Sequence, residues 1–188
     1  ANWETDYALS SEYKIETWDD GKALSVKGTK FDDTLIIGQS DFDVLNANNG
    51  NHVSIQDKAG NDSIVILSKE HNVNVRIGAG DDYAYLGHHF GELGENNWYN
   101  INLYNATQAR FDVQTVGVIL NESYMPSVDS QGNWVLTDAS TVGALNAVLV
   151  TDVLKTGIDY GSNLLVGFDR IQFSTGQIQM EIEEYSSS

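Results

Sequence analysis

The sequence predicts a mostly β protein, in which a short parallel β-solenoid packs against a mixed β cap with at most one helix. Two observations support this fold class. Turns rich in Gly, Asn and Asp recur through the first half of the chain, and a short run of β-branched or aromatic residues follows each of them. From Trp98 onward the runs become longer and alternate between apolar and polar residues, as the strands of a half-buried sheet do.

Four of the turns end in an aspartate that directly precedes a predicted strand. Successive spacings between these aspartates are 10, 19 and 20 residues. A period near ten with a strand in each unit is typical of a parallel β-solenoid, in which two units make one coil. Degenerate turns near residues 52 and 72 fill the two gaps in the period. The spacing therefore predicts that Asp43, Asp62 and Asp82 stack in one column, with Asp33 on the other edge.

Residues 1–97 are expected to hold the solenoid with its N-terminal cap strands, and residues 98–188 to form the β-rich C-terminal half of the same domain. In that half, residues 99–104 and 111–116 are the clearest strands. Residues 165–178 contain two alternating strands around a Ser-Thr-Gly turn. Only residues 141–154 have a helical spacing of apolar side chains, and the valines in this segment favour a strand instead.

Composition excludes several functional classes. The 188 residues include 27 acids against 10 Lys plus Arg, a formal net charge of −17. Such a chain lacks the basic face that nucleic acids and anionic membranes require. It has no Cys, hence no disulfide and no thiol nucleophile. No apolar run has the length of a membrane span, and no signal peptide opens the chain. We expect a monomeric module of a larger chain, without nucleic-acid partners or membrane insertion.

The common catalytic motifs are missing from the sequence. There is no nucleophile elbow and no Gly-Lys-Ser/Thr loop for phosphate. Paired acids would suit glycoside hydrolysis, but the pairs fall in the repeating turns. We therefore expect that the chain is not an enzyme.

The repeating acids are better explained by a cation. Carboxylates stacked at the strand spacing of about 4.8 Å repel one another, and a hard dication between them removes the repulsion. Ca²⁺ takes about 6–8 oxygen ligands, which carboxylates and turn carbonyls can supply together. Without thiolates or clustered imidazoles the sequence disfavours zinc, copper and iron, and Mg²⁺ requires a tighter octahedron. The sequence predicts several Ca²⁺ ions, with candidate ligands Asp33, Asp41, Asp43, Asp57, Asp62, Asp81 and Asp82 and the backbone near Gly60, Gly78 and Gly80.

Two of the turns resemble the nonapeptide calcium repeats of the RTX (repeats-in-toxin) family, Gly-Gly-x-Gly-x-Asp-x-apolar-x. Residues 78–84 keep two glycines and the aspartate, and residues 59–64 keep the last glycine, the aspartate and the apolar residue. The repeats depart from the pattern at Phe31 and Asp41, which replace the third glycine, so the resemblance implies fewer ions than a full array binds. With its sparse repeats and large C-terminal half, the chain is most similar to the peptide-binding domains of giant bacterial RTX adhesins.

This resemblance implies a β-roll-like, calcium-bound solenoid outside the cell or on a bacterial surface. It also implies binding of a peptide, through the C-terminal carboxylate of that peptide, on a target cell. Two alternatives stay open. One is a structural calcium-folding or spacer unit, and the other is a glycan-binding accessory domain of an extracellular enzyme.

The loop at residues 87–98 has two interpretations. It can be a simple junction between the halves, or the rim of a ligand site beside the last cation turn. In the second interpretation imidazole, amide and indole groups contact the ligand, and two tyrosines of the preceding strand supply stacking area. The candidate ligand-binding residues are Tyr83, Tyr85, His88, His89, Asn96, Asn97 and Trp98.

Overall fold

The computed structural model describes residues 12–15, 24–37, 52–67, 72–87, 98–103 and 105–179. These residues form fourteen β-strands and one 3₁₀ turn, which confirms the expectation of a mostly β protein. No helix in this part of the chain has the length and hydropathy to cross a membrane. The elements are β1 (Glu12–Ile15), β2 (Leu24–Lys27), β3 (Thr34–Ile37), β4 (His52–Gln56), β5 (Ser63–Ile66), β6 (Asn72–Arg76), β7 (Tyr83–Leu86), β8 (Trp98–Leu103), η2 (Gln108–Arg110), β9 (Phe111–Val118), β10 (Leu136–Thr137), β11 (Leu145–Asp152), β12 (Ser162–Val166), β13 (Arg170–Phe173) and β14 (Gly176–Gln179).

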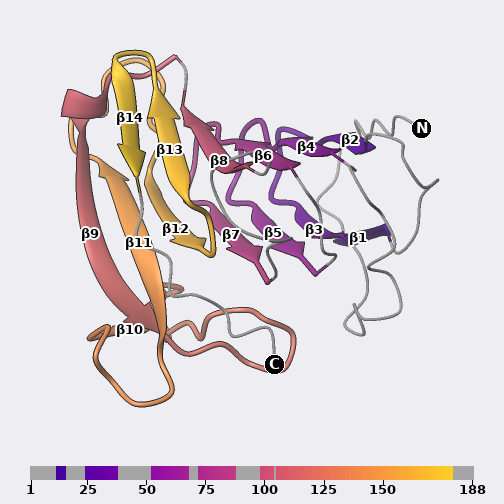
Figure 1. Ribbon diagram of the computed structural model, residues 1–188, viewed down its shortest axis with the longest axis vertical. Helices are drawn as coiled ribbons and strands as arrows, with labels where there is room; N and C mark the ends of the chain where they lie inside the picture. Colours follow the sequence, from indigo (N-terminus) through magenta and orange to yellow (C-terminus); the bar gives the residue numbers. More distant parts are fainter. Residues whose placement is uncertain are drawn as a thin grey trace.

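The strands form two mixed sheets that lie on either side of a shared core (Figure 1). The large sheet has the order β1-β3-β5-β7-β12-β11-β9-β10, and the small sheet has the order β14-β13-β8-β6-β4-β2. From β2 to β8 the chain passes from one sheet to the other after every strand. Each strand from β2 to β6 pairs in parallel with the strand two positions later. Strands β4 and β6 occupy the two predicted degenerate units.

The C-terminal half continues both sheets. Strand β12 pairs in parallel with β7, and β13 pairs in parallel with β8. Between β8 and β12 the chain makes an excursion, in which β9 and β11 pair along eight residues in the antiparallel sense. The halves expected to meet at residue 97 therefore share both sheets.

The suggestion of a helix at residues 141–154 is wrong. Residues 145–152 form β11, which is held between β9 and β12. Val148 and Val150 share the face that packs on the inner core, where Val150 is fully buried, and Ala147 and Leu149 lie on the opposite face. The predicted hairpin at the end of the chain is confirmed, because β13 and β14 pair across Ser174 and Thr175.

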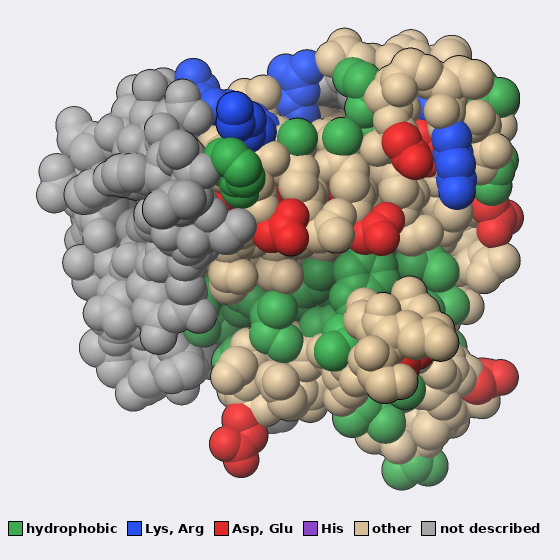
Figure 2. Space-filling model, turned by 180° about the vertical axis from the view of Figure 1, so that it is seen from behind, with side chains coloured by type: hydrophobic (Ala, Val, Ile, Leu, Met, Phe, Trp, Pro, Cys, Tyr) green, Lys and Arg blue, Asp and Glu red, His purple; other side chains and the backbone are tan. Residues whose placement is uncertain are grey.

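Two hydrophobic clusters hold the sheets. The inner cluster fills the space between them with aliphatic residues such as Leu35, Val53 and Ile64, each of which has no exposed surface. A fully buried side chain of this kind contributes about 1.5–3 kcal/mol. The outer cluster lies where residues 119–144, the middle of the excursion, pack on the large sheet. Seen from behind, hydrophobic side chains gather in a recess above that excursion, with acidic side chains along its upper rim (Figure 2).

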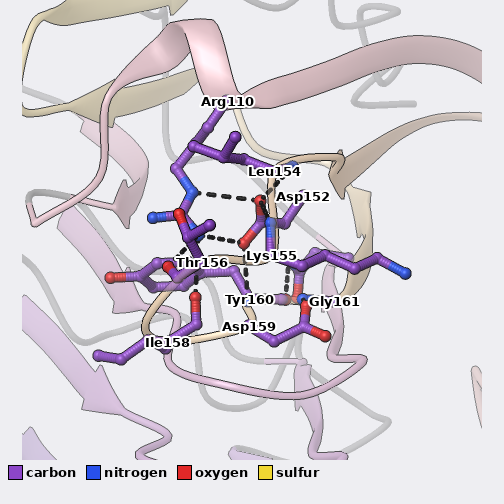
Figure 3. A network of polar contacts seen from close by, with 10 residues as sticks. Arg110, Asp152, Leu154, Lys155, Thr156, Ile158, Asp159, Tyr160 and Gly161 are labelled. Atoms are coloured by element: carbon purple, nitrogen blue, oxygen red, sulfur yellow. Dashed lines mark hydrogen bonds and ion pairs between the residues drawn. The ribbon is translucent and has the colours of Figure 1, made fainter.

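A polar network fixes the return of the excursion to the sheets (Figure 3). The Arg110 guanidinium donates to both carboxylate oxygens of Asp152, at 3.1 and 2.7 Å, and also to the carbonyls of Thr156 and Ile158. Asp152 has no exposed surface and also accepts the N–H of Tyr160. Burial raises the pKa of this carboxyl, but hydrogen bonds from Arg110, Lys155 and Tyr160 outweigh burial and bring its pKa to about 2. Asp152 therefore stays ionised and holds residues 153–160 in one path to β12.

Candidate metal centre

The aspartate turns stack directly on one another at one edge of the molecule. Each turn leads from the small sheet into the large one, and its last residue precedes β3, β5 or β7. The N–H of Asp33 donates to Oδ1 of Asp62, and the N–H of Asp62 donates to Oδ1 of Asp82, both at 2.8 Å. We call residues 28–33, 57–62 and 78–82, together with residues 159–163 described below, the turn stack.

The position of Asp33 corrects a prediction. Asp33 was expected on the other edge, but it lies in the same column as Asp62 and Asp82, because β3 pairs in register with β5. The physical reason is the number of residues between the two turns. Asp33 and Asp62 are 29 residues apart rather than about 20. Residues 38–51, which include Asp41 and Asp43, lie outside the described residues.

A fourth turn, not predicted from the sequence, completes the column. The N–H of Asp82 donates to Oδ1 of Asn163, at 3.2 Å, where the chain returns from the excursion. Gly161 stands in this turn where Gly80 stands in the preceding one, and its φ is also positive, at +65° against +105°. The sequence does contain a signal for this turn, because Gly161 precedes Asn163 by two residues, as Gly80 precedes Asp82. The repeat period does not reveal the turn, because 81 residues separate Asn163 from Asp82.

A second, exposed ladder runs beside the column, one residue earlier in each turn. Oδ1 of Asp32 accepts the N–H of Asn61, and Oδ1 of Asn61 accepts the N–H of Asp81. Oδ1 of Asp81 in turn accepts the N–H of Ser162. These side chains therefore align successive turns from the solvent side, and Asp81 has no place in the buried cluster described next.

Three buried carboxylates converge inside the turn stack. Asp57, Asp62 and Asp82 each offer an oxygen, and these oxygens lie within 4.8 Å of one another. None of the three residues is more than 1% exposed. Oδ1 of Asp57 accepts the N–H of Gly78 at 2.6 Å, so each residue has one oxygen bound to the backbone of a neighbouring turn. The other oxygen, Oδ2, has no hydrogen-bond partner in any of the three.

The carboxylate of Asp33 is satisfied differently. The backbone N–H of Thr29 donates to its Oδ2 at 2.6 Å, and the Thr29 hydroxyl donates to the same carboxylate. The carboxylate of Asp33 thus bonds within its own turn, although the backbone N–H of Asp33 joins the column. Among the predicted ligands that the structure describes, only Asp57, Asp62 and Asp82 gather as acids.

The predicted glycines make the close stacking possible. Gly60 and Gly80 have backbone φ values of +98° and +105°, which residues other than glycine rarely adopt. A Cβ on Gly80 would overlap the carbonyl oxygen of Gly60, and a Cβ on Gly78 would overlap the carbonyl oxygen of Lys58. The backbones of successive turns therefore meet directly.

The cluster strongly disfavours three negative charges. Burial raises the pKa of Asp62 to about 8, with further contributions from the charges of Asp57 and Asp33. Burial likewise raises the pKa of Asp57 and of Asp82, and their mutual repulsion drives the pKa of Asp82 higher. Three unpartnered acceptor oxygens in a buried site are the donor set that a cation requires, and oxygen-only ligands suit a hard cation. The residues present therefore fit a metal ion.

Acid should stabilise the protein when no cation is bound. Because the pKa of Asp62 is raised from 3.8 to about 8, the folded state holds a proton that the unfolded chain releases. This contribution is complete below about pH 4 and is lost as the pH rises through about 8. We expect the melting temperature in excess chelator to fall over that range, and Asp62→Asn to flatten the fall. A melting temperature that rises over this range would contradict the assignment.

The candidate ligand-binding residues do not form a rim in the part of the chain that is described. Tyr83 and Tyr85 are buried, 1% and 7% exposed, beneath the excursion. The Tyr83 hydroxyl donates to the carbonyl of Tyr124, and the Tyr85 ring stacks on the Tyr124 ring at 5.3 Å. They offer no exposed stacking area. Trp98 is the first residue of β8. His88, His89, Asn96 and Asn97 lie outside the described residues.

Comparison of the chain with protein-family models, with curated proteins and with solved structures found no match in any of the three.

Proposed function

We propose that the chain is a calcium-dependent binding module, in which the turn stack is a short β-roll-like solenoid held by Ca²⁺. The observation that carries this proposal is the set of three buried Oδ2 atoms of Asp57, Asp62 and Asp82, none of which has a hydrogen-bond donor. Alternation of the chain between two parallel stacks of strands supports the solenoid.

The rest of the proposal concerns location and ligand. Extracellular calcium modules bind the ion at about 10⁻⁴–10⁻³ M, so a site of this class fills outside the cell and not in the cytosol. The turns resemble RTX repeats, and the excursion at residues 104–161 adds β structure that a simple spacer would not need. We therefore propose a secreted bacterial adhesin module that binds peptide on another cell, with glycan as the competing ligand.

The calcium part is tested by calorimetry of the whole chain in chelator, in Ca²⁺ and in Mg²⁺. Ca²⁺ at a hundredfold excess over Kd stabilises the folded state by about 2.7 kcal/mol. For a chain of this size, that free energy raises Tm by about 5–11 °C. We expect Mg²⁺ to give much less. An identical Tm in all three solutions would overturn the proposal.

The ligand part is tested by screening immobilised peptides and glycans with and without chelator. Capture of peptides only when Ca²⁺ is present is the expected result. Glycan capture would replace the ligand class, and capture of neither class would leave a purely structural calcium unit in place of a binder.

A further inference from the structure

We infer that the open edge of β9 binds an extended peptide of another polypeptide, which adds a strand to the large sheet in line with β10. The kind of partner rests on the proposed binding function. The surface itself is one that the calcium proposal does not use.

Strand β9 has a neighbour along its whole length on one side only. On that side all eight residues pair with β11. On the other side β10 pairs only with Gly117 and Val118. Residues 111–116 therefore face no strand on their outer side among those described, and β9 and β10 form the outer margin of the large sheet (Figure 1).

The direction of the backbone groups follows from one hydrogen bond. The N–H of Val153 donates to the carbonyl of Arg110 at 2.9 Å, in the same register as the β9–β11 pairs. In an antiparallel strand, residues two apart direct their backbone groups to the same side. Asp112 and Gln114 therefore face β11, as Arg110 does, and Val113 and Thr115 direct their N–H and C=O groups to the open side. Gly117 has the same parity and is paired there with β10. Four backbone groups are thus positioned to bind a further strand.

This edge has only part of the usual protection against strand addition. Proteins shield exposed edges with charged side chains (above all Lys), Pro, bulges, very short strands or a covering loop. Strand β9 is eight residues long, contains neither Lys nor Pro, and has Asp112 as its one charged residue. Strand β10 ends after Thr137 because Asp138 begins a turn, in which its carbonyl accepts the N–H of Thr141. The line of β10 is therefore open beside Val113 and Thr115.

Side chains along β9 define the partner. On the inner side Val113 packs against the core between the sheets and stays partly exposed, as does Ile178 of β14. On the other side Asp112 and Gln114 are exposed. A partner strand with apolar residues at alternate positions would match the face that carries Val113, and a basic residue opposite Asp112 would match the other face. The net charge of −17 opposes a second copy of this chain as the partner.

The test uses the peptide acetyl-Lys-Val-Thr-Val-Lys-Val-Thr-amide and the whole chain in Ca²⁺. In a strand-addition complex the peptide should slow hydrogen exchange at the amides of Val113 and Thr115. Methylation of the peptide nitrogens, one at a time, should weaken binding about tenfold at alternate positions and leave the positions between unchanged. This measurement needs no protein variant, so it does not depend on the folding of a mutant.

A pair of variants separates backbone from side chain. Thr115→Pro removes the outward N–H, which an edge strand tolerates, whereas Thr115→Ala keeps it. Binding should weaken about tenfold in the first variant and less than about threefold in the second.

Equal losses in the two variants would overturn the inference, as would no binding at about 1 mM peptide. Dimerisation of the free protein that Thr115→Pro abolishes would show that the occupant is a second copy. Calcium-dependent peptide capture without protection of Val113 and Thr115 would overturn this inference and leave the proposed function intact. Protection of the β9 amides by the peptide, with no change of melting temperature in Ca²⁺, would overturn the proposed calcium function and leave this inference intact.

Discussion

Asp82→Asn should separate the folding of the turn stack from its response to Ca²⁺. An asparagine in this column can still accept a backbone N–H through Oδ1, as Asn163 does from Asp82. The variant therefore keeps the hydrogen bond from the N–H of Asp62 but loses one anionic ligand. Because calcium affinity depends on the number of charged ligands, we expect Kd to rise about 100-fold or more and the gain in Tm to disappear at an unchanged Ca²⁺ concentration.

The same variant should be more stable than the wild type in chelator. Burial and the charge of Asp57 raise the pKa of Asp82, so near pH 8 the wild type must hold a proton there or suffer repulsion. The asparagine removes that cost. Asp81→Asn is the matched control, because Asp81 is exposed in the same turn and, among the residues that the structure describes, bonds only within the outer ladder. It should respond to Ca²⁺ like the wild type. A full calcium response in Asp82→Asn would exclude this cluster as the cation site.

Local patterns predicted much of this structure, because the turn and the strand that follows it are encoded by adjacent residues. Gly60, Asp62 and the apolar run after them mark a turn and β5 without reference to the rest of the chain. The same holds for Gly80 and Asp82 before β7. The buried cluster was partly predictable as well, since Asp57, Asp62 and Asp82 were all candidate ligands and the structure brings them together.

Longer-range features were missed where the period is interrupted. The separation of 29 residues between Asp33 and Asp62 shifted the predicted register by one unit and put Asp33 on the wrong edge. The excursion separated Asn163 from the column that it completes. Strand β11 was ambiguous because its spacing of apolar residues also fits a helix. Pairing with β9 and β12 on both sides decides the outcome, and that pairing is tertiary information.

Gly80→Ala should be the most damaging single-methyl change in the turn stack. The added Cβ would overlap the carbonyl oxygen of Gly60 in the preceding turn, at a backbone φ of +105° that alanine rarely adopts. Unfavourable φ alone costs about 1–2 kcal/mol. Relief of the overlap must also separate the two turns, and this would move Asp62 away from Asp82. We expect a total loss of about 3 kcal/mol or more, with a weaker gain in stability from Ca²⁺.

Gly132→Ala is the control that isolates the conformational part. Gly132 has a φ of +84°, but a Cβ there would meet no atom within 4 Å. Unfolding in urea should therefore show a loss of only about 1–2 kcal/mol for this variant, and an unchanged response to Ca²⁺. The difference between the two variants measures how strongly the contact between successive turns supports the carboxylate cluster. Equal losses would mean that the turns at Gly60 and Gly80 can separate freely, and the cluster could not then depend on their contact.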